Sequence, residues 1–336
     1  MRITVLSGGV GGARFTLGLL ALLRERLPDG SGGTTAEVTV VANTGDDMWL
    51  HGVRVCPDLD TLMYTLGGAV HPGQGWGRRE ETRRVSTDLA AYDLGWDWFT
   101  LGDLDLATHL ARTQLLREGF TLSQVTDRLC RRWQPGVRLV PMSDHEVETH
   151  VLVTDDDGTS PRPERLMHFE EWWVRYRASL PALRFVQVGL EGAVPAPGVL
   201  AALTETDVVL LPPSNPVVSV GTILALPGVR AALAGSPAPV VGVSPIVGGA
   251  AVRGMADACL RTLGVETSAA AVARHYGLRS AGGLLDAWLV DTADSGCVLG
   301  LAGQGWLVSA VPTLMTDVAA TAEIAAQALA LVGREP

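Results

Sequence analysis

The chain has 336 residues, 47% of them hydrophobic and 18% charged, which is typical of a globular protein and excludes a disordered one. Its net charge of −10 argues against a nucleic-acid-binding protein, whose surface is basic as a rule. The sequence has no run of about 18 apolar residues and its cysteines form no CxxC pair, so we expect no membrane span and a reducing, cytoplasmic location.

The first fourteen residues predict a strand, a glycine turn and a helix. Apolar and polar residues alternate at the start, glycines occupy positions 8, 9, 11 and 12, and an apolar run at helical spacing follows over residues 15–23. Such a turn lets backbone N–H groups close on an anion at a helix N-terminus, which predicts a phosphate-bearing ligand. The residues expected to contact it are Gly9, Gly11, Gly12 and Arg14.

Two familiar phosphate-binding motifs do not fit this turn. A Walker A loop ends in Gly-Lys-Ser/Thr, where this chain has Gly12-Ala13-Arg14. The dinucleotide fingerprint requires glycine or alanine at the position of Arg14 and an acid at the end of the second strand, where Asn43 stands. A tight strand–helix turn without a ligand remains the alternative.

Short runs rich in Val, Ile and Leu recur along the chain, each ending in Gly, Asn, Asp or Pro before a helical pattern. Such runs indicate an α/β fold with a mostly parallel sheet covered by helices on both faces. The expected strands are residues 3–6, 38–42, 185–188, 208–211, 240–243, 288–290 and 306–310.

This format breaks between residues 63 and 183, which we interpret as an inserted, mainly helical region forming one wall of a cleft. The α/β core then comprises residues 1–62 and 184–336. Thr121 or Ser123 is the expected N-cap of the second helix in the insertion. The elements expected there are two helices within 104–133, an extended stretch over 137–155, a turn at 155–158 and a helix over 168–179.

Aspartates follow the second expected strand in two groups. Asp46 and Asp47 come directly after it, and Asp58 and Asp60 lie about a dozen residues further on. Mg²⁺ in proteins takes one or two carboxylates, keeps waters and holds substrate phosphates, so these aspartates predict a magnesium site. Capping of the helices that follow is the alternative interpretation.

Two further polar loops follow expected strands. PPSNP comes after residues 208–211, and SPIVGG comes after residues 240–243. Both would present N–H donors at the carboxyl edge of the sheet, although ordinary turns remain an alternative. The residues expected to bind the ligand there are Ser214, Asn215, Ser244 and Gly248, together with Asn43 after the second strand.

Seven motifs in one order carry a family resemblance. They are SGGVGGAR, VANTGDD, CPDLDTLMYTLGG, LGDLDLATHLAR, LVPMSD, LLPPSNPVVSVGTILALPGVR and VSPIVGG. In this order they resemble the 2-phospho-L-lactate transferase family of deazaflavin coenzyme F-420 biosynthesis, and its actinobacterial phosphoenolpyruvate branch most closely. The resemblance covers essentially the whole chain.

The resemblance implies a Rossmann-like fold with an inserted helical region, a homodimer and dependence on Mg²⁺. It implies two small-molecule substrates, the deazaflavin Fo and a guanosine diphosphate ester of a three-carbon acid, either enolpyruvyl or lactyl. The enzyme would join the phospho-acid to the terminal ribityl hydroxyl of Fo and release GMP. The sequence does not distinguish the two donors, which differ by two hydrogens.

The same resemblance assigns roles to the aspartates. The family's acidic motif matches Asp46, Asp47, Asp58 and Asp60, and its Fo-binding aspartate corresponds best to Asp60. We expect Asp46 and Asp60, with Asp47 as a further candidate, to hold Mg²⁺, and Asp58 or Asp60 to accept the hydroxyl proton. Asp46, Asp58 and Asp60 are therefore the expected catalytic residues.

The chain departs from the family at one position. Relatives often carry a basic residue near the LGD motif, where this chain has Leu104. The candidate substitutes are Arg78, Arg79 and Arg112.

Two other classes of protein compete with a transferase. A nicotinamide-dependent oxidoreductase is disfavoured by the broken fingerprint. A non-enzymatic regulator of the gluconeogenesis-factor type, which binds nucleotide sugars, shares the glycine loop. The aspartates at 46–60 and the loop at 214–216 favour a catalytic function over a regulatory one.

Overall fold

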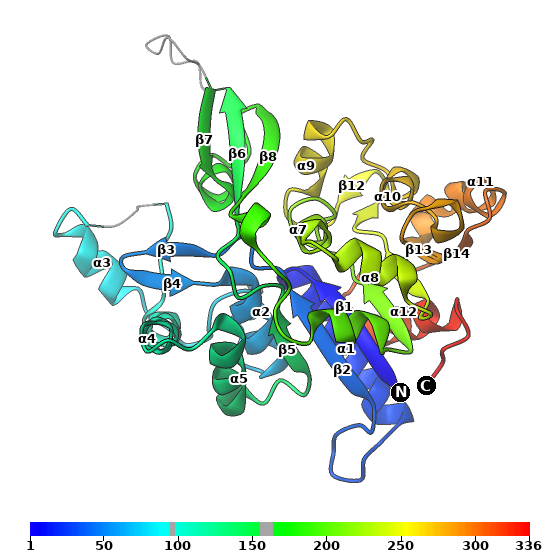
Figure 1. Cartoon of the computed structure of the whole chain (residues 1–336), viewed down its shortest axis with the longest axis horizontal. Helices are drawn as coiled ribbons and strands as arrows, with labels where there is room; N and C mark the ends of the chain where they lie inside the picture. The colour runs from blue at the N-terminus through cyan, green and yellow to red at the C-terminus, as the bar shows by residue number, and fades with distance from the viewer. Residues whose placement is uncertain (95–97, 155–163) are drawn as a thin grey trace.

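A computed structural model describes residues 1–94, 98–154 and 164–336 of the chain (Figure 1). Its centre is a seven-stranded sheet in the order β14-β13-β10-β9-β1-β2-β5, in which every pairing is parallel. The strands are β1 (Arg2–Ser7), β2 (Glu37–Ala42), β5 (Arg138–Pro141), β9 (Val208–Leu211), β10 (Val240–Val243), β13 (Ala287–Asp291) and β14 (Leu307–Val311). The α/β fold predicted from the sequence is confirmed.

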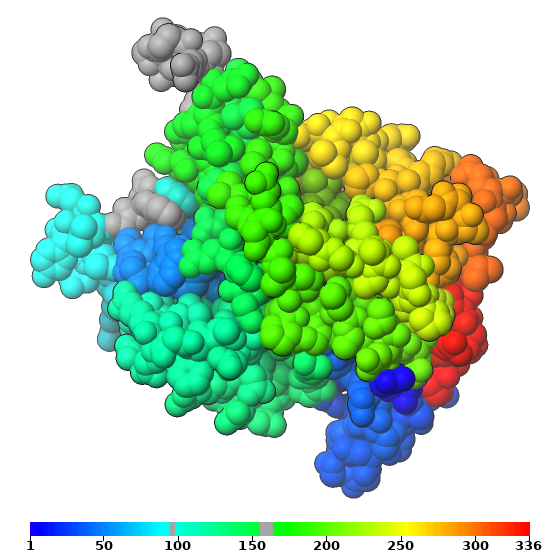
Figure 2. Space-filling model, in the orientation of Figure 1, coloured from blue at the N-terminus to red at the C-terminus, as the bar shows by residue number. Residues whose placement is uncertain are grey.

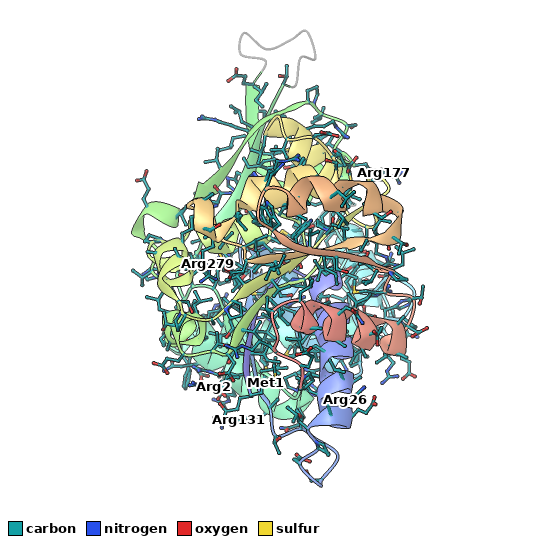
Figure 3. All side chains as sticks on the ribbon, turned by 90° about the vertical axis from the view of Figure 1, so that its right-hand side faces the viewer. Met1, Arg2, Arg26, Arg131, Arg177 and Arg279 are labelled. Carbon is teal, nitrogen blue, oxygen red and sulfur yellow. The ribbon has the colours of Figure 1, made fainter. Side chains whose placement is uncertain are left out.

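Helices cover both faces of this sheet, which explains why its strands are apolar without interruption. Along β1, Ile3 and Val5 pack into one core cluster and Leu6 into the other. Figure 3 shows α12 lying across α1, and Gly18 of α1 lies directly against Thr321 of α12. The helices of that face are α1 (Val10–Arg26), α2 (Pro57–Leu66), α5 (Leu122–Trp133) and α12 (Val318–Ala330).

The opposite face is covered by short helices. Leu6, Val209 and Trp288 belong to the core cluster there. The helices with residues in this cluster are α6 (Val199–Thr204), α7 (Val220–Ala225), α8 (Val229–Gly235), α9 (Ala256–Thr262), α10 (Ala269–Tyr276) and α11 (Val298–Ala302).

The remaining elements lie outside the central sheet. A three-stranded antiparallel sheet has the order β7-β6-β8. Figure 2 shows this sheet and α3 as two projections of the molecular surface. The elements are β3 (Met48–Leu50), β4 (Val53–Val55), α3 (Arg84–Ala90), α4 (Asp103–Arg117), β6 (Glu148–Thr154), β7 (Glu164–His168), β8 (Ala182–Val188), β11 (Ile246–Val247) and β12 (Ala250–Ala251).

One strand assignment from the sequence is wrong. The strand expected at 185–188 is part of β8, which pairs antiparallel with β6 outside the central sheet. It carries Arg184 and Gln187 and stays half-exposed, whereas a central parallel strand is buried on both faces. The extended stretch expected over 137–155 is confirmed, since it contains β5 and β6. β5 lies within the expected insertion, yet it pairs with β2 as an edge strand of the central sheet, where Leu139 and Val140 are buried.

The helices of the inserted region follow the prediction in part. α4 and α5 are separated at Gly119, and Thr121 caps α5 in a reciprocal capping box with Gln124. The helix expected over 168–179 is limited to a single short segment at Glu171–Arg175. The turn expected at 155–158 lies outside the described residues, and the domain boundaries at 62 and 184 remain a prediction.

None of the helices in the described ranges is long and apolar enough to cross a bilayer.

Candidate functional site

A cavity of about 620 Å³ opens at the carboxyl edge of the central sheet. The loops after β1, β2, β9 and β10 all contribute to its wall, as expected for ligand binding in an open parallel sheet. Residues from α2, α4 and the segment after β7 also line it, together with residues within 74–83, 98–102, 252–256 and 313–315. The polar loops that the sequence placed after separate strands therefore meet at one site.

The glycine loop presents backbone donors to this cavity. α1 begins at Val10 with Gly9 as its N-cap, and among the described residues no side chain caps the first turn. The N–H groups of that turn can therefore donate to an anion, and the helix dipole favours negative charge there. A side chain at Gly9 would place its Cβ 2.5 Å from Oδ1 of Asp58, and one at Gly11 would overlap the Pro213 carbonyl. Both glycines allow close packing that a side chain would prevent.

Gly12 lies behind the cavity wall instead of on it. Its Cα faces the hydroxyls of Ser7 and Ser214, which leave no room for a side chain. Ser214 also accepts a hydrogen bond from the Gly8 N–H at 3.2 Å. Gly12 and Ser214 therefore join the loops that follow β1 and β9.

Two arginines give one end of the cavity a positive charge. Arg14 and Arg253 both line the wall, and no carboxylate in the described part of the chain forms an ion pair with Arg14. Partial burial and then the charge of Arg253 lower the pKa of Arg14. Two like charges without a counter-ion favour an anionic ligand between them.

Asp46, Asp58 and Glu170 form a buried group of carboxylates in the cavity wall, which we name the acidic centre. Burial raises the pKa of Asp46, with further increases from the charges of Asp58 and Glu170. Burial raises the pKa of Asp58 to about 6, and burial together with the Asp58 charge raises that of Glu170 to about 8. Within the described residues no basic side chain forms an ion pair with any of the three, so a bound cation would stabilise them.

Neighbouring groups orient the acidic centre. Asn43 donates from Nδ2 to Oδ2 of Asp58 at 2.9 Å, and its Oδ1 accepts from the Gly45 N–H at 2.9 Å. Oδ1 of Asp46 is buried and has no hydrogen-bond partner among the described residues. Asn43 does not itself line the cavity, so it positions Asp58 instead of contacting a ligand.

Glu170 is the functional candidate that the sequence interpretation missed. It lies two residues after the end of β7, at the entry to the short helix that carries Trp172. It is far along the chain from Asp58 and belongs to no strand–helix repeat of the central sheet. Its signal in the sequence is an acid two residues after a strand.

Asp60 belongs to a different network. Its carboxylate forms a buried ion pair with Arg112, and its Oδ2 lies 3.5 Å from Nδ1 of His109. Nε2 of His109 lies 3.5 Å from Asp105, which accepts a hydrogen bond from the Tyr64 hydroxyl at 2.7 Å. Burial raises the pKa of Asp60 although Arg112 and His109 act against it. Asp60 thus already has a cationic partner, unlike the acidic centre.

Asp47 does not reach the cavity. It is fully buried, and Arg54 is the nearest charge that favours its ionised form. Burial nevertheless raises the pKa of Asp47 to about 7. The structure therefore separates Asp47 from its neighbour Asp46, with which the sequence had grouped it.

The loops after β9 and β10 contribute unequally. Ser214, Asn215 and Ser244 line the cavity, but Oδ1 of Asn215 accepts from the Val217 N–H at 2.9 Å. Gly248 is not in the wall, and its N–H donates to Asp294 at 3.0 Å.

The arginines considered as substitutes for the family's basic residue do not line the cavity. Arg78 donates to the Leu104 carbonyl at 2.9 Å and stacks on Trp133, Arg79 binds the Gly68 carbonyl, and Arg112 pairs with Asp60. The arginines found in the wall are Arg14, Arg83 and Arg253.

Much of the remaining wall is aromatic and apolar. The larger side chains of this type include Trp76, Trp98, Phe99, Phe169, Trp173, Val174, Val252, Met255 and Met315. Aromatic faces of this kind suit a planar ring system. The cavity therefore joins a cationic end, an acidic centre and an aromatic wall.

The raised pKa of Glu170 predicts that the metal-free protein loses stability as the pH rises. The folded chain keeps a proton at a pKa of about 8 that the unfolded chain, with a pKa of about 4.3, has already released. This stabilisation is complete below the unfolded pKa and is lost as the pH rises through about 8. We expect the melting temperature to fall between about pH 5 and pH 8 and the slope to flatten in Glu170→Gln. Glu171→Gln is the control, and an equal slope in Glu170→Gln would contradict the assignment.

Comparison with known proteins gives consistent relationships. A family model described as 2-phospho-L-lactate transferase CofD matches residues 3–298. The chain is 57% identical over 331 residues to a phosphoenolpyruvate transferase of Streptomyces coelicolor, covering 98% of each chain. It is 53% identical over 345 residues to one of Mycobacterium avium, covering 100% of each.

Solved structures add a similar fold. A protein of the UPF0052 family from Bacillus halodurans superposes with a TM-score of 0.51 at 16% identity, covering 87% of this chain and 80% of that one. At this identity the likeness shows the fold alone.

Proposed function

This chain belongs to the 2-phospho-L-lactate transferase CofD family, and we propose that it transfers a phosphoenolpyruvyl group to Fo in the biosynthesis of coenzyme F-420. The donor is the guanosine diphosphate ester of enolpyruvate, the acceptor is the terminal ribityl hydroxyl of Fo, and GMP leaves. The observation that carries the proposal is the single cavity that joins a cationic end, the acidic centre and an aromatic wall. The names of the relatives favour enolpyruvyl over lactyl as the transferred acid.

The cationic end suits the diphosphate of the donor. The N–H groups at the start of α1, with Arg14 and Arg253, supply fixed positive charge, and the Asp58 carboxylate lies beside Gly9 at the same turn. Such donors stabilise charge on transferred phosphoryl groups without reorganising during the reaction. The aromatic wall, which includes Trp76 and Trp173, suits the flat deazaflavin ring.

The acidic centre fits Mg²⁺. Three buried carboxylates, one with an unpartnered oxygen, provide the hard oxygen ligands that this ion prefers. We propose that Asp46 and Asp58 hold it, with Glu170 as the third candidate, whereas Asp47 faces Arg54 and does not line the cavity. When bound, Mg²⁺ supplies charge neutralisation at the phosphate oxygens.

The reaction exchanges a phosphoanhydride bond of the donor for a phosphoester bond to Fo. The hydroxyl oxygen of Fo forms a bond to the phosphorus that carries the enolpyruvyl group, and the bond from that phosphorus to the GMP oxygen breaks. We propose that the Asp60 carboxylate accepts the hydroxyl proton, since Asp60 lies in the cavity wall and its Oδ2 has no hydrogen-bond partner in the described residues. Arg112 holds the other oxygen of that carboxylate and so fixes its orientation.

The direct test is incubation with Fo, Mg²⁺ and each donor ester, followed by mass spectrometry of the product. We expect the enolpyruvyl donor to give a product two hydrogens lighter than the lactyl donor, and to be consumed faster. Faster turnover of the lactyl donor would overturn the donor assignment. Absence of product with either donor would overturn the transferase itself.

The non-enzymatic alternative makes a different prediction. A nucleotide-sugar regulator would not bind Fo, whereas a transferase should shift the absorbance of Fo on binding. The homodimeric state and the cytoplasmic location remain predictions, and light scattering of the purified protein tests the first.

A further inference from the structure

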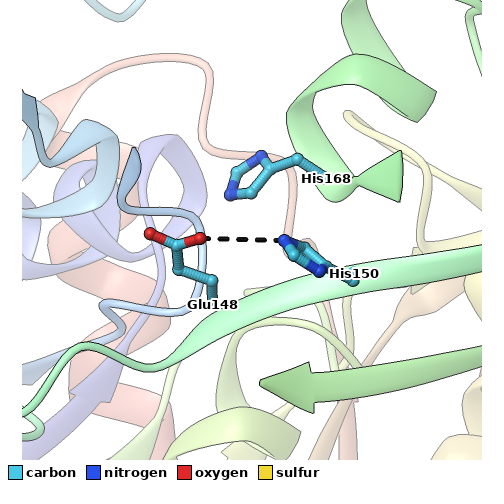
Figure 4. Close-up of side chains that lie close together, drawn as sticks. All are labelled: Glu148, His150 and His168. Atoms are coloured by element: carbon cyan, nitrogen blue, oxygen red, sulfur yellow. Dashed lines mark ion pairs between the residues drawn. The ribbon is translucent and has the colours of Figure 1, made fainter. Parts of the chain in front are cut away.

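A second group of metal-binding side chains lies away from the cavity. Figure 4 shows Glu148 and His150 on β6 close to His168 on β7, and none of the three lines the cavity wall. His150 lies directly opposite His168 in the antiparallel pair, and Glu148 lies two residues before His150. Side chains in these positions share one face of a sheet. One ligand atom from each residue lies within 4.8 Å of the others.

The carboxylate of Glu148 is already oriented for a cation. Its Oε1 accepts a hydrogen bond from Nη1 of Arg54 at 2.7 Å, and its Oε2 lies 3.7 Å from Nε2 of His150. A hydrogen bond to the second oxygen is a common feature of carboxylate ligands. The positive charge of Arg54 is shared with two further carboxylates, those of Glu146 at 3.8 Å and of Asp47. The surroundings of Glu148 therefore carry more negative than positive charge.

His168 supplies the independent observation. Its Nε2 is buried, and although the backbone of Asp47 is close to the ring, Nε2 makes no hydrogen bond of normal geometry within the described residues. A buried polar atom without a partner is costly, and a metal ion would satisfy it. Glu148 and His150 each keep 23% of their side chains exposed, which gives an ion access from solvent.

We propose that Glu148, His150 and His168 bind a transition-metal ion at a site distinct from the acidic centre. Two imidazole nitrogens and one carboxylate oxygen are the donor set that Zn²⁺ and its neighbours take, whereas Mg²⁺ prefers oxygen ligands. Three protein ligands leave one coordination position for water. The site therefore selects its ion by ligand type, and Mg²⁺ at the acidic centre does not compete for it.

Binding at this site is linked to the acidic centre. Nδ1 of His168 accepts a hydrogen bond from the Glu170 N–H at 3.2 Å. Ligation through Nε2 moves the imidazole proton to Nδ1, which replaces that acceptor with a donor. Metal occupancy therefore removes one of the contacts that position Glu170.

Titration with Zn²⁺ alone against a chromophoric chelator, in a large excess of Mg²⁺, tests the proposal. We expect one Zn²⁺ per chain, and weakening by roughly 100-fold or more in His150→Ala and in Glu148→Gln. Glu148→Gln keeps the shape of the side chain, so the result does not depend on a truncation. His145→Ala removes an exposed histidine nearby and should leave Zn²⁺ affinity unchanged.

Co²⁺ provides a second readout, because its visible absorption reports metal ligation directly and does not depend on whether these side chains stabilise the fold. Visible d–d absorption bands should appear in the wild-type protein and in His145→Ala, and should be lost in His150→Ala at an unchanged melting temperature. Saturable Zn²⁺ binding of equal affinity in His150→Ala would overturn the site. So would the absence of saturable binding in the wild-type protein.

Discussion

Asp46→Asn should lower kcat by roughly 10²- to 10³-fold and abolish the dependence on Mg²⁺, because it removes one carboxylate from the acidic centre. The same change should raise the melting temperature of the metal-free protein. Burial and the charges of Asp58 and Glu170 act against the ionised form of Asp46, and the amide carries no charge. The buried charge of Asp46 thus lowers stability while it supports activity, and Asp46→Asn should remove both effects together.

Asp47→Asn is the matched control, since it makes the same change one residue along the chain. Asp47 lies outside the cavity wall and faces Arg54, so kcat should stay within a few-fold of the wild type. Its melting temperature should rise, as that of Asp46→Asn does, because burial also acts against the ionised form of Asp47 and raises its pKa to about 7. Steady-state kinetics over a Mg²⁺ series and thermal melts of both variants decide the matter. Equal loss of activity in the two variants would contradict the assignment.

The sequence predicted the features that follow from the geometry of parallel strands. The carboxyl ends of parallel strands meet at one edge, so the loops carrying Gly9, Asp46, Ser214 and Ser244 could be expected to converge. They do line one cavity. The α/β fold was predictable for the same reason, because strands buried on both faces leave uninterrupted apolar runs.

The predictions from the sequence failed where the local residue pattern does not determine the structure. This was the case for the pairing of strands and for the direction of individual side chains. β8 resembles a core strand in composition, yet it pairs antiparallel with β6. Adjacent aspartates point in different directions, and only the structure shows that Asp46 reaches the cavity while Asp47 faces Arg54. Glu170 could not be placed, because it enters the site from the antiparallel sheet and not from the repeat of strands and helices.

Asp60→Asn should lower kcat by at least about 100-fold, as loss of a general base typically does. In the wild type the rate should fall at low pH as Asp60 becomes protonated. This acid limb of the pH–rate profile should disappear in Asp60→Asn. The change also leaves Arg112 buried without its carboxylate, which costs about 3–5 kcal/mol of stability in comparable buried pairs. A loss of activity alone would therefore not separate catalysis from folding.

Arg112→Met separates the two effects, because it breaks the same ion pair and keeps the Asp60 carboxylate. We expect a similar loss in the free energy of unfolding, measured by urea denaturation, for both variants. Without Arg112, which lowers the pKa of Asp60 in the wild type, the acid limb of the Arg112→Met profile should move to higher pH. At a pH above that limb, and at a temperature well below both melting transitions, Arg112→Met should retain far more activity than Asp60→Asn. If both variants lose activity equally there, Asp60 acts only through its ion pair, and the proton must go to the acidic centre, where Asp58 is the next candidate.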